Sequence, residues 1–295
     1  MGQMIKARNL SVGDFIRSPQ KRKRILVVET VGSEIFARGL DKKDIDRHIF
    51  LGKEDMVEKV TDVITETSVI DMPTPVAYWK MDDNTDNTVV KDEMGTYNGT
   101  AQRNTNLMSA DGIRGRALRF NGSSDYVDTG ETFQTIFRNS FSVSLWVKPD
   151  EGQPLINMYW VGNRDDSAYN RFGIRQVFDG TIGVAYESNN IYKFTQSESV
   201  NFSSGQEKWH NVVVVAVADM QMYIYFDGQK VDLKAKYDGD LSSMTFADFT
   251  MDQTLFLGAR NLGGSDSLHY EGLMDSVGIF DCALSPLQVK SLQKK

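Results

Sequence analysis

Carboxylate pairs and histidines are the side chains in this chain that could carry acid–base catalysis. Cleavage of a glycosidic bond requires two carboxyl groups facing the same cleft. The acidic pairs Glu54-Asp55 and Asp165-Asp166 would place neighbouring side chains on opposite faces of an extended strand. The histidines His48, His210 and His269 are scattered, and neither a His-Glu-x-x-His motif nor a nucleophile elbow occurs. We therefore expect a protein that is not an enzyme, since general acid–base work needs converging groups.

Aromatic and amide side chains in the middle of the chain offer a different chemistry. Aromatic faces stack on sugar rings, and amide groups hydrogen-bond to sugar hydroxyls. We expect a glycan-binding site formed by Trp160, Tyr159, Tyr186, Asn190 and Tyr192, with Tyr169 and Asn189 in the same region. The alternative is that Trp160 and several of the tyrosines belong to the hydrophobic core.

The elements that position these residues are predicted to be strands. The valine-rich run Val212–Ala218 is too short to span a membrane and too β-branched for a helix, so it predicts a strand covered on both faces. Asp227-Gly228 lies between the strand-like runs Tyr223–Phe226 and Gln229–Leu233. This dipeptide supplies the positive φ angles of a two-residue turn, so it predicts a tight hairpin.

The same pattern extends over the chain from Val76 onward. Short alternating or aromatic-rich runs recur between Gly, Asn and Asp turns. The further strands that we expect are Ala77–Met81, Ala117–Phe120, Tyr126–Thr129, Phe141–Val147, Leu155–Val161, Phe172–Val177, Thr181–Tyr186, Tyr192–Thr195, Leu255–Ala259 and Gly272–Phe280. So many short strands with little helical periodicity predict an all-β fold, a two-sheet antiparallel sandwich. One short helix is expected over Leu287–Lys295, because Ser285 is a good N-cap and Pro286 a good first residue.

Composition and charge exclude several classes of protein. The chain has 295 residues, 40% of them hydrophobic, and a net charge of −7, which argues against general nucleic-acid binding. The single cysteine, Cys282, excludes an intramolecular disulfide. No run approaches the roughly 20 apolar residues of a membrane helix, and the first residues lack the apolar core of a secretory signal. We therefore expect synthesis in the cytoplasm without a signal peptide, and no membrane insertion.

Residues 1–70 are predicted to form a separate small β-rich domain. Its strand candidates are Val12–Arg17, Arg24–Glu29 and Glu34–Arg38, while Asp41–Thr67 would hold two more strands or a short helix. Three short strands in about forty residues favour a small β-barrel-like domain, and the opening Val-Gly-Asp-Phe is similar to the start of SH3-like barrels. The basic run Lys21–Arg24 is expected to be a solvated hairpin loop, with a polyanion contact as the alternative.

A short linker is predicted between the two domains. Pro73 and Pro75 bracket Thr74, and prolines at alternate positions stiffen the backbone toward an extended form. We therefore assign residues 71–75 to a semi-rigid linker and residues 76–295 to the second domain.

The second domain resembles the laminin G-like family of concanavalin A-type jelly rolls. The motifs that carry this resemblance occur in the family's order: Ala77–Asp83, Gly112–Gly122, Asp125–Val127, Phe141–Pro149, Trp209–Val212, Phe226–Gly228, Gly258–Arg260, Gly272–Asp275 and Ala283–Ser285. The resemblance covers about residues 76–292 and implies a jelly-roll sandwich. It also implies a structural role for His210 and for Trp146, which keeps phase with Ser142 and Ser144. Related hydrolases carry a catalytic Glu-x-Asp-x-Glu strand, and that spacing does not occur in this sequence.

The resemblance also implies a structural calcium ion. Calcium prefers six to eight oxygen ligands from carboxylates, amides and carbonyls. The implied ligands are Asp275, Asp83, Asp82, Asn121 and Asp125, with Asp275 the one most firmly implied. The alternative is that Asp82, Asp83 and Asp125 are turn residues and that Asp275 is a hydrogen-bonding residue at a sheet edge.

Two functions remain open after catalysis is set aside. The first is a structural or interaction protein of a bacteriophage particle, a capsid decoration or tail-associated component. Its N-terminal domain would bind other virion or surface proteins, and its jelly roll would display a glycan- or protein-binding surface. The alternative is a carbohydrate-binding, lectin-like module of a bacterial surface or polysaccharide-processing system. A virion-associated protein would often form a symmetric homo-oligomer, although no coiled-coil heptads enforce one here.

Overall fold

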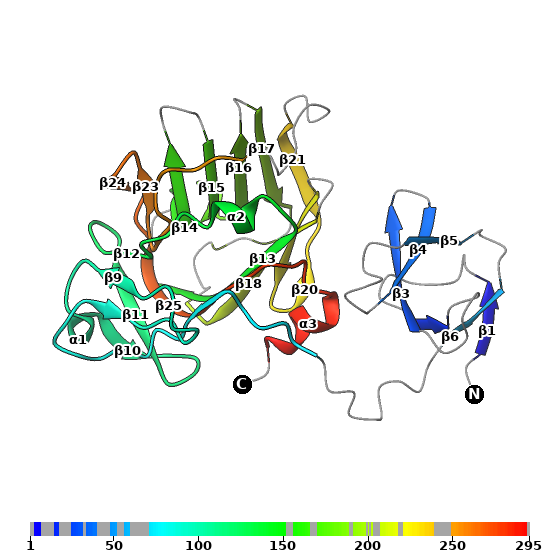
Figure 1. Cartoon of the computed structure of the whole chain (residues 1–295), viewed down its shortest axis with the longest axis horizontal. Helices are drawn as coiled ribbons and strands as arrows, with labels where there is room; N and C mark the ends of the chain where they lie inside the picture. The colour runs from blue at the N-terminus through cyan, green and yellow to red at the C-terminus, as the bar shows by residue number, and fades with distance from the viewer. Residues whose placement is uncertain are drawn as a thin grey trace. The chain divides into compact units, whose positions relative to one another are not determined.

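The computed structural model describes residues 71–151, 156–165, 170–188, 191–198, 200, 202, 207–217, 221–238 and 249–293, together with the backbone of six strands between residues 3 and 59. At 165, 188, 191 and 235–238 it likewise describes the backbone alone. The chain divides into two compact units, Met1–Asp71 and Met72–Lys295 (Figure 1). Among the described residues, no helix is long and apolar enough to cross a membrane.

The N-terminal unit contains one six-stranded antiparallel sheet with the order β1-β6-β2-β3-β4-β5. Its strands are β1 (Gln3–Lys6), β2 (Phe15–Arg17), β3 (Ile25–Val31), β4 (Glu34–Gly39), β5 (His48–Leu51) and β6 (Met56–Lys59). The charged stretch 41–67 therefore contributes two strands. The basic run Lys21–Arg24 lies outside the described residues.

The second unit is a sandwich of two sheets, as the sequence predicts (Figure 1). Sheet I has the order β10-β11-β25-β13-β18-β19-β20, and β7 also pairs with β25. Its strands are β7 (Ala77–Trp79), β10 (Ser109–Asp111), β11 (Arg116–Asn121), β13 (Phe141–Pro149), β18 (His210–Val217), β19 (Gln221–Phe226), β20 (Gln229–Lys230) and β25 (Glu271–Phe280). The first and last strands of the jelly roll thus lie side by side.

Sheet II has the order β21-β17-β16-β15-β14-β22-β12-β9-β8, and β23 joins it by running parallel to β14. Its strands are β8 (Val89–Val90), β9 (Gly99–Ala101), β12 (Val127–Asp128), β14 (Met158–Asp165), β15 (Asn170–Gln176), β16 (Ile182–Ser188), β17 (Ile191–Ser197), β21 (Leu233–Asp238), β22 (Phe256–Leu257), β23 (Arg260–Leu262) and β24 (Ser265–Ser267). In Figure 1 the strands β14 to β17 stand next to one another.

Local sequence explains the short helices and the hairpin. The helices are α1 (Thr105–Met108), α2 (Gln134–Phe137) and α3 (Pro286–Ser291). Ser285 caps α3 in a capping box with Gln288, which confirms the predicted N-terminus of this helix. Asp227 and Gly228 have φ angles of 48° and 75°, so the hairpin between β19 and β20 has the predicted two-residue turn.

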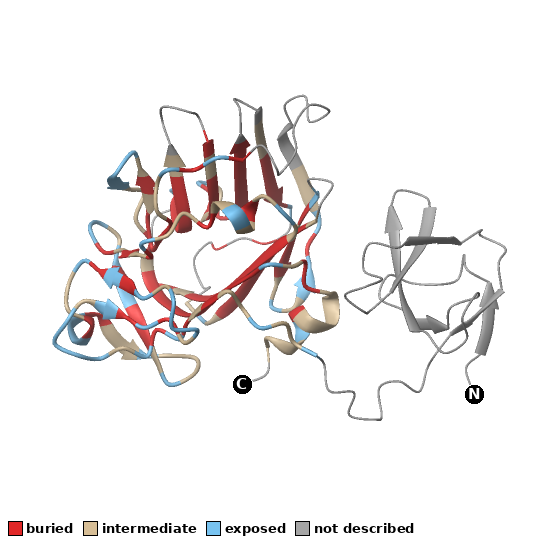
Figure 2. Cartoon of the chain, viewed as in Figure 1, coloured by how far each residue is buried: buried red, intermediate tan, exposed pale blue. Residues whose placement is uncertain are grey.

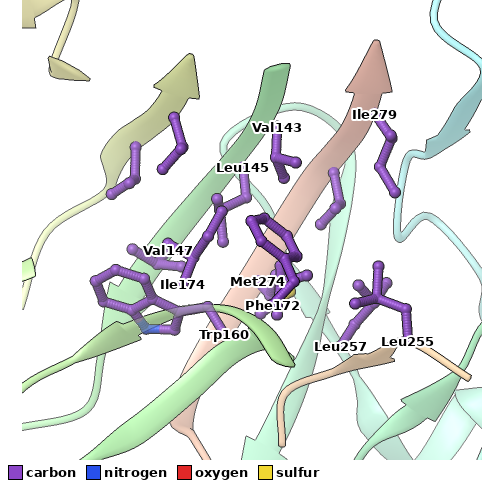
Figure 3. Packing of buried hydrophobic residues seen from close by; sticks show 14 of the residues in the cluster. Val143, Leu145, Val147, Trp160, Phe172, Ile174, Leu255, Leu257, Met274 and Ile279 are labelled. Atoms are coloured by element: carbon purple, nitrogen blue, oxygen red, sulfur yellow. The ribbon is translucent and has the colours of Figure 1, made fainter. Parts of the chain in front are cut away.

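The core lies between the two sheets and depends on the two-residue period of the strands. Val143, Leu145 and Val147 of β13 point inward from sheet I, and Phe172 and Ile174 of β15 point inward from sheet II (Figure 3). Buried residues follow the facing strands of both sheets in Figure 2. Every second residue of these strands therefore faces away from the core and is available for other contacts.

Replacing Phe172 tests how much this layer contributes. Phe172 is fully buried against Phe137 and Phe141, with ring centroids 4.3 and 5.3 Å away. We expect Phe172→Ala to lower the free energy of unfolding by about 3–5 kcal/mol in a denaturant titration, because it leaves a cavity in the core. Phe178→Ala is the matched control, since that ring is 59% exposed and should change stability by less than about 0.5 kcal/mol. Equal effects of the two changes would contradict the assigned core.

Candidate functional site

The outer face of sheet II, which points away from sheet I, carries an unusual set of side chains. In β15, Phe172 and Ile174 belong to the core, so Arg171, Gly173 and Arg175 point outward. The neighbouring strand places Ala185 opposite Gly173 and Glu187 opposite Arg171. Two arginines separated by a glycine thus face outward in the middle of the sheet.

Tyr159 of β14 lies flat across this part of the sheet. A Cβ atom on Gly162 or on Gly173 would overlap its ring, so the glycines make room for it. A β-bulge between Tyr159 and Val161 interrupts the register there. Tyr159 is only 1% exposed although its strand position faces outward. Its ring therefore lies beneath the other side chains of the site and does not itself face solvent.

Arginine side chains cover the aromatic rings. The guanidinium carbon of Arg175 lies 5.4 Å from the ring centroid of Tyr159 and 4.7 Å from that of Phe194. Arg260 lies over the same tyrosine at 5.5 Å. Tyr192 stacks on Phe194 at 6.1 Å with an interplanar angle of 10°. We name the set Arg171, Arg175, Arg260, Tyr159, Tyr192 and Phe194 the arginine–aromatic layer.

Arg171 closes one end of this layer. Its guanidinium carbon lies 4.6 Å from the centroid of Tyr192, and its Nε donates to Glu187 Oε2 at 2.5 Å. Burial raises the pKa of the Tyr192 phenol, while the positive charges of Arg175 and Arg171 oppose this shift. Arg171 is therefore both stacked and neutralised.

Arg175 and Arg260 are placed differently from Arg171. Arg175 Nη1 donates to the Tyr159 hydroxyl at 3.1 Å, and Arg260 Nε donates to Ser267 Oγ at 3.2 Å. Among the described residues, no carboxylate forms an ion pair with either arginine. Burial lowers the pKa of Arg260, and the nearby charge of Arg164 lowers it further. The layer thus offers fixed, partly exposed cationic donors on an apolar base.

Such a surface can bind a polar ligand without reorganising. Guanidinium groups present several N–H donors in a rigid plane, and stacking on a ring fixes that plane. A few oriented donors above an apolar base are typical of sites that recognise small molecules.

The residues predicted from the sequence for glycan binding divide into three groups. Tyr159 and Tyr192 belong to the arginine–aromatic layer. Trp160 and Tyr186 are fully buried in the core, with Trp160 beside Val147 and Ile174 in Figure 3. The Tyr186 hydroxyl donates to the carbonyl of Phe137, so neither ring presents a face to a sugar. The sequence-based set also includes Asn190, Asn189 and Tyr169, all of which lie outside the described residues.

The arginines of the layer were not predicted, although the sequence contained a signal for them. The run Arg171-Phe172-Gly173-Ile174-Arg175 alternates between charged or small residues and apolar ones. A strand with this pattern must place both arginines on the face opposite the core. Arg260, by contrast, comes from β23, and only the pairing of β23 with β14 brings it near Tyr159.

Asp275 and Asp82, two of the implied calcium ligands, hold one turn of the backbone. Asp275 is fully buried, and its Oδ2 accepts hydrogen bonds from the N–H groups of Ile113 at 2.9 Å and Arg114 at 3.1 Å. Asp82 Oδ1 accepts from the N–H of Arg116 at 2.7 Å. Both carboxylates therefore serve as backbone acceptors at the turn before β11.

The other three implied ligands lie in separate environments. Asp83 accepts from the N–H of Lys91, and Asn121 Oδ1 accepts from three N–H groups of its own turn. Asp125 forms a bidentate ion pair with Arg103, whose Nε donates to Oδ1 at 2.9 Å and whose Nη2 donates to Oδ2 at 2.7 Å. No group of three or more His, Cys, Asp or Glu side chains in the described part of the chain is arranged to hold a metal ion. The five residues together do not fit a calcium site, and a calcium ion at Asp275 stays a prediction.

His210 and Trp146 have the structural roles that the resemblance implies. His210 is buried, and its Nδ1 lies 2.8 Å from Asp227 Oδ2 beside the hairpin turn. Trp146 points outward from sheet I, away from the core, as the phase of its strand predicts. It forms the floor of a cavity of about 240 Å³ whose walls include Met72, Pro75 and Phe280. Residues of the predicted linker thus pack on sheet I.

Comparisons with known proteins identify the fold. A sequence model of the concanavalin A-like lectin/glucanases superfamily matches residues 121–290, which confirms the resemblance. Domain 4 of AbnA, an extracellular GH43 arabinanase from Geobacillus stearothermophilus solved in complex with arabinotriose, is 22% identical with a TM-score of 0.52. That alignment covers 76% of this chain and all of the domain.

Toxin binding domains have the same fold. The binding domain of Paraclostridial Mosquitocidal Protein 1 is 17% identical with a TM-score of 0.51, over 72% of this chain and 52% of that one. The receptor binding domain of botulinum neurotoxin C/D mosaic serotype is 14% identical with a TM-score of 0.51, over 74% and 50% of the two chains. These likenesses show the fold alone. No curated protein sequence matches the chain.

Substitutions of Asp275 test its role as a backbone acceptor. Asp275→Asn keeps an oxygen that can accept from Ile113 and Arg114, so it should leave stability near that of the parent at pH 7. Asp275→Ala leaves two partly buried N–H groups without their acceptor and should cost about 1–3 kcal/mol of unfolding free energy. Similar losses in both variants would contradict the acceptor role.

The pH dependence of the same variants has a predicted sign. Burial raises the pKa of Asp275 from 3.8 to about 6, against the opposing hydrogen bonds from Ser276, Arg114 and Ile113. Between these two pH values the folded state binds more protons at Asp275 than the unfolded state does. The contribution of Asp275 to the free energy of unfolding therefore rises as the pH falls through 6. The parent should gain stability relative to Asp275→Asn on acidification from pH 7 to pH 4.

If Asp275 binds calcium, added calcium should raise the melting temperature of the parent but not of Asp275→Asn.

Proposed function

Since the chain belongs to the concanavalin A-like lectin/glucanases superfamily, we propose that it is a carbohydrate-binding module of lectin type that binds its ligand on the outer face of sheet II. The observation that carries this proposal is the arginine–aromatic layer. Its donors are held in place by stacking on buried rings, so little conformational freedom is lost on binding.

The chemistry of the layer suits a sugar. Sugar hydroxyls accept hydrogen bonds from planar guanidinium donors, and the apolar face of a sugar ring packs against flat groups. The Geobacillus stearothermophilus domain was solved in complex with arabinotriose, so in that protein the same fold holds a saccharide. This supports a glycan as the partner class for the present chain.

From the sequence alone, a bacteriophage virion component is the first hypothesis and a lectin-like module is the alternative. The family and the layer support the second hypothesis better. The virion hypothesis, including partners of the N-terminal unit and a homo-oligomer, stays a prediction. Mass spectrometry of purified particles tests it, because a virion component must co-purify with the particle.

A glycan array with the full chain, followed by calorimetry on the hits, tests the proposed function. The double variant Arg171→Gln/Glu187→Gln removes one stacked guanidinium without leaving a buried carboxylate unpaired, and it should bind at least about tenfold more weakly. Arg119→Gln is the control, because Arg119 pairs with Asp150 on sheet I, away from the layer. Melting temperatures confirm that both variants fold.

Two results would contradict this proposal. The first is an array without any hit, or a double variant that binds as tightly as Arg119→Gln. The second is release of reducing ends from a bound glycan, because it would show a glycoside hydrolase rather than a binding module.

A further inference from the structure

Two guanidinium groups of the arginine–aromatic layer lie over one aromatic ring, that of Tyr159. Arg175 Nη1 donates to the Tyr159 hydroxyl at 3.1 Å, and Arg260 Nε donates to Ser267 Oγ at 3.2 Å. Both guanidinium carbons lie within 5.5 Å of the same ring centroid. The two cations therefore flank one aromatic ring at the base of the site.

This pair of charges is not compensated within the described part of the chain. Glu187 neutralises Arg171, but no described carboxylate forms an ion pair with Arg175 or Arg260. Arg175 Nε is in addition buried without an acceptor. The net charge of the chain is −7, so a concentration of unpaired cations at one place is not a consequence of composition.

Placing two cations together out of water costs free energy. The partial burial of Arg260 and the charges of Arg164 and Arg171 all disfavour its charged form. A buried N–H donor without an acceptor adds a further cost. An anion bound between Arg175 and Arg260 would offset the cost of the two neighbouring charges, because it would pair with both of them.

We infer that the site formed by Arg175, Arg260 and Tyr159 binds the anionic group of an acidic saccharide. The planar fork of a guanidinium matches a carboxylate or a sulfate, both of which present two oxygens in a plane. The shared chemistry is thus a sugar that carries a carboxylate or a sulfate ester. This inference rests on the proposed function and assigns its ligand class.

Different parts of the layer contact the charged and the uncharged portions of the proposed ligand. The Arg175–Arg260 pair takes the charged group, whereas Arg171 and Tyr192, stacked at 4.6 Å, lie further along the layer and contact the uncharged part of the ligand. Loss of either arginine of the pair should therefore weaken binding of the charged ligand far more than binding of its neutral counterpart.

Calorimetry with matched ligands tests this inference. The full chain is titrated with oligogalacturonide and with its methyl ester, which lacks the negative charge. A second arm uses a sulfated oligosaccharide and its desulfated form, and so distinguishes a carboxylate from a sulfate. The parent should bind the charged member of at least one pair about tenfold or more tightly than the neutral member, and added salt should reduce this difference.

Variants assign the preference to the two arginines. Arg175→Gln and Arg260→Gln should each lower the ratio of charged-ligand affinity to neutral-ligand affinity about tenfold or more, because the lost guanidinium contributes more to binding an anion than to binding a neutral sugar. Arg119→Gln should keep the preference, because Arg119 lies on sheet I and pairs with Asp150. Melting temperatures of all three variants, compared with the parent, show that a loss of binding is not a loss of fold.

The outcomes separate this inference from the function on which it rests. Equal affinity of the parent for charged and neutral ligands would overturn the anion site but not the carbohydrate-binding function. A preference that survives in both Arg175→Gln and Arg260→Gln would overturn the assignment as well. Absence of binding to every saccharide would overturn both proposals.

Discussion

The alternation of side chains along β15 of sheet II is the constraint on which this site depends. Phe172 and Ile174 must face the core, because the sandwich is held by the apolar layer between its sheets. Arg171, Gly173 and Arg175 are then forced onto the opposite face, and a shift of one residue in register would exchange the two sets. The same packing that stabilises the fold therefore fixes the position of the cationic donors.

The glycines of sheet II connect this constraint to the chemistry of the site. Gly162 and Gly173 leave space that the ring of Tyr159 fills, and the ring in turn supports Arg175 and Arg260. A tyrosine without that space would stand away from the sheet and could not lie beneath both guanidinium groups. Backbone, ring and cation thus form consecutive layers, so each guanidinium plane is oriented before a ligand arrives.

Most of the fold was predictable from the sequence, because its signals are local. Asp227-Gly228 predicts its hairpin, Ser285 and Pro286 predict the start of α3, and the phase of Trp146 predicts its outward position. The site was less predictable. Alternation alone could not say whether Tyr159 or Trp160 faces the core, and Arg260 reaches Tyr159 only through a pairing between distant segments. The implied calcium ligands likewise have partners that are distant in sequence. Asp125 pairs with Arg103, and Asp275 accepts from the backbone N–H of Ile113.

The most direct measurement is a two-dimensional ¹H–¹⁵N NMR spectrum of the arginine side chains during titration of the full chain with oligogalacturonide. The Nε–H resonance of each arginine reports on its guanidinium group, so a carboxylate bound to that group should shift it. The account predicts shifts at Arg175 and Arg260 and no shift at Arg119. Shifts confined to the surroundings of Trp146 on sheet I, or no shift at the two arginines of the layer, would contradict it.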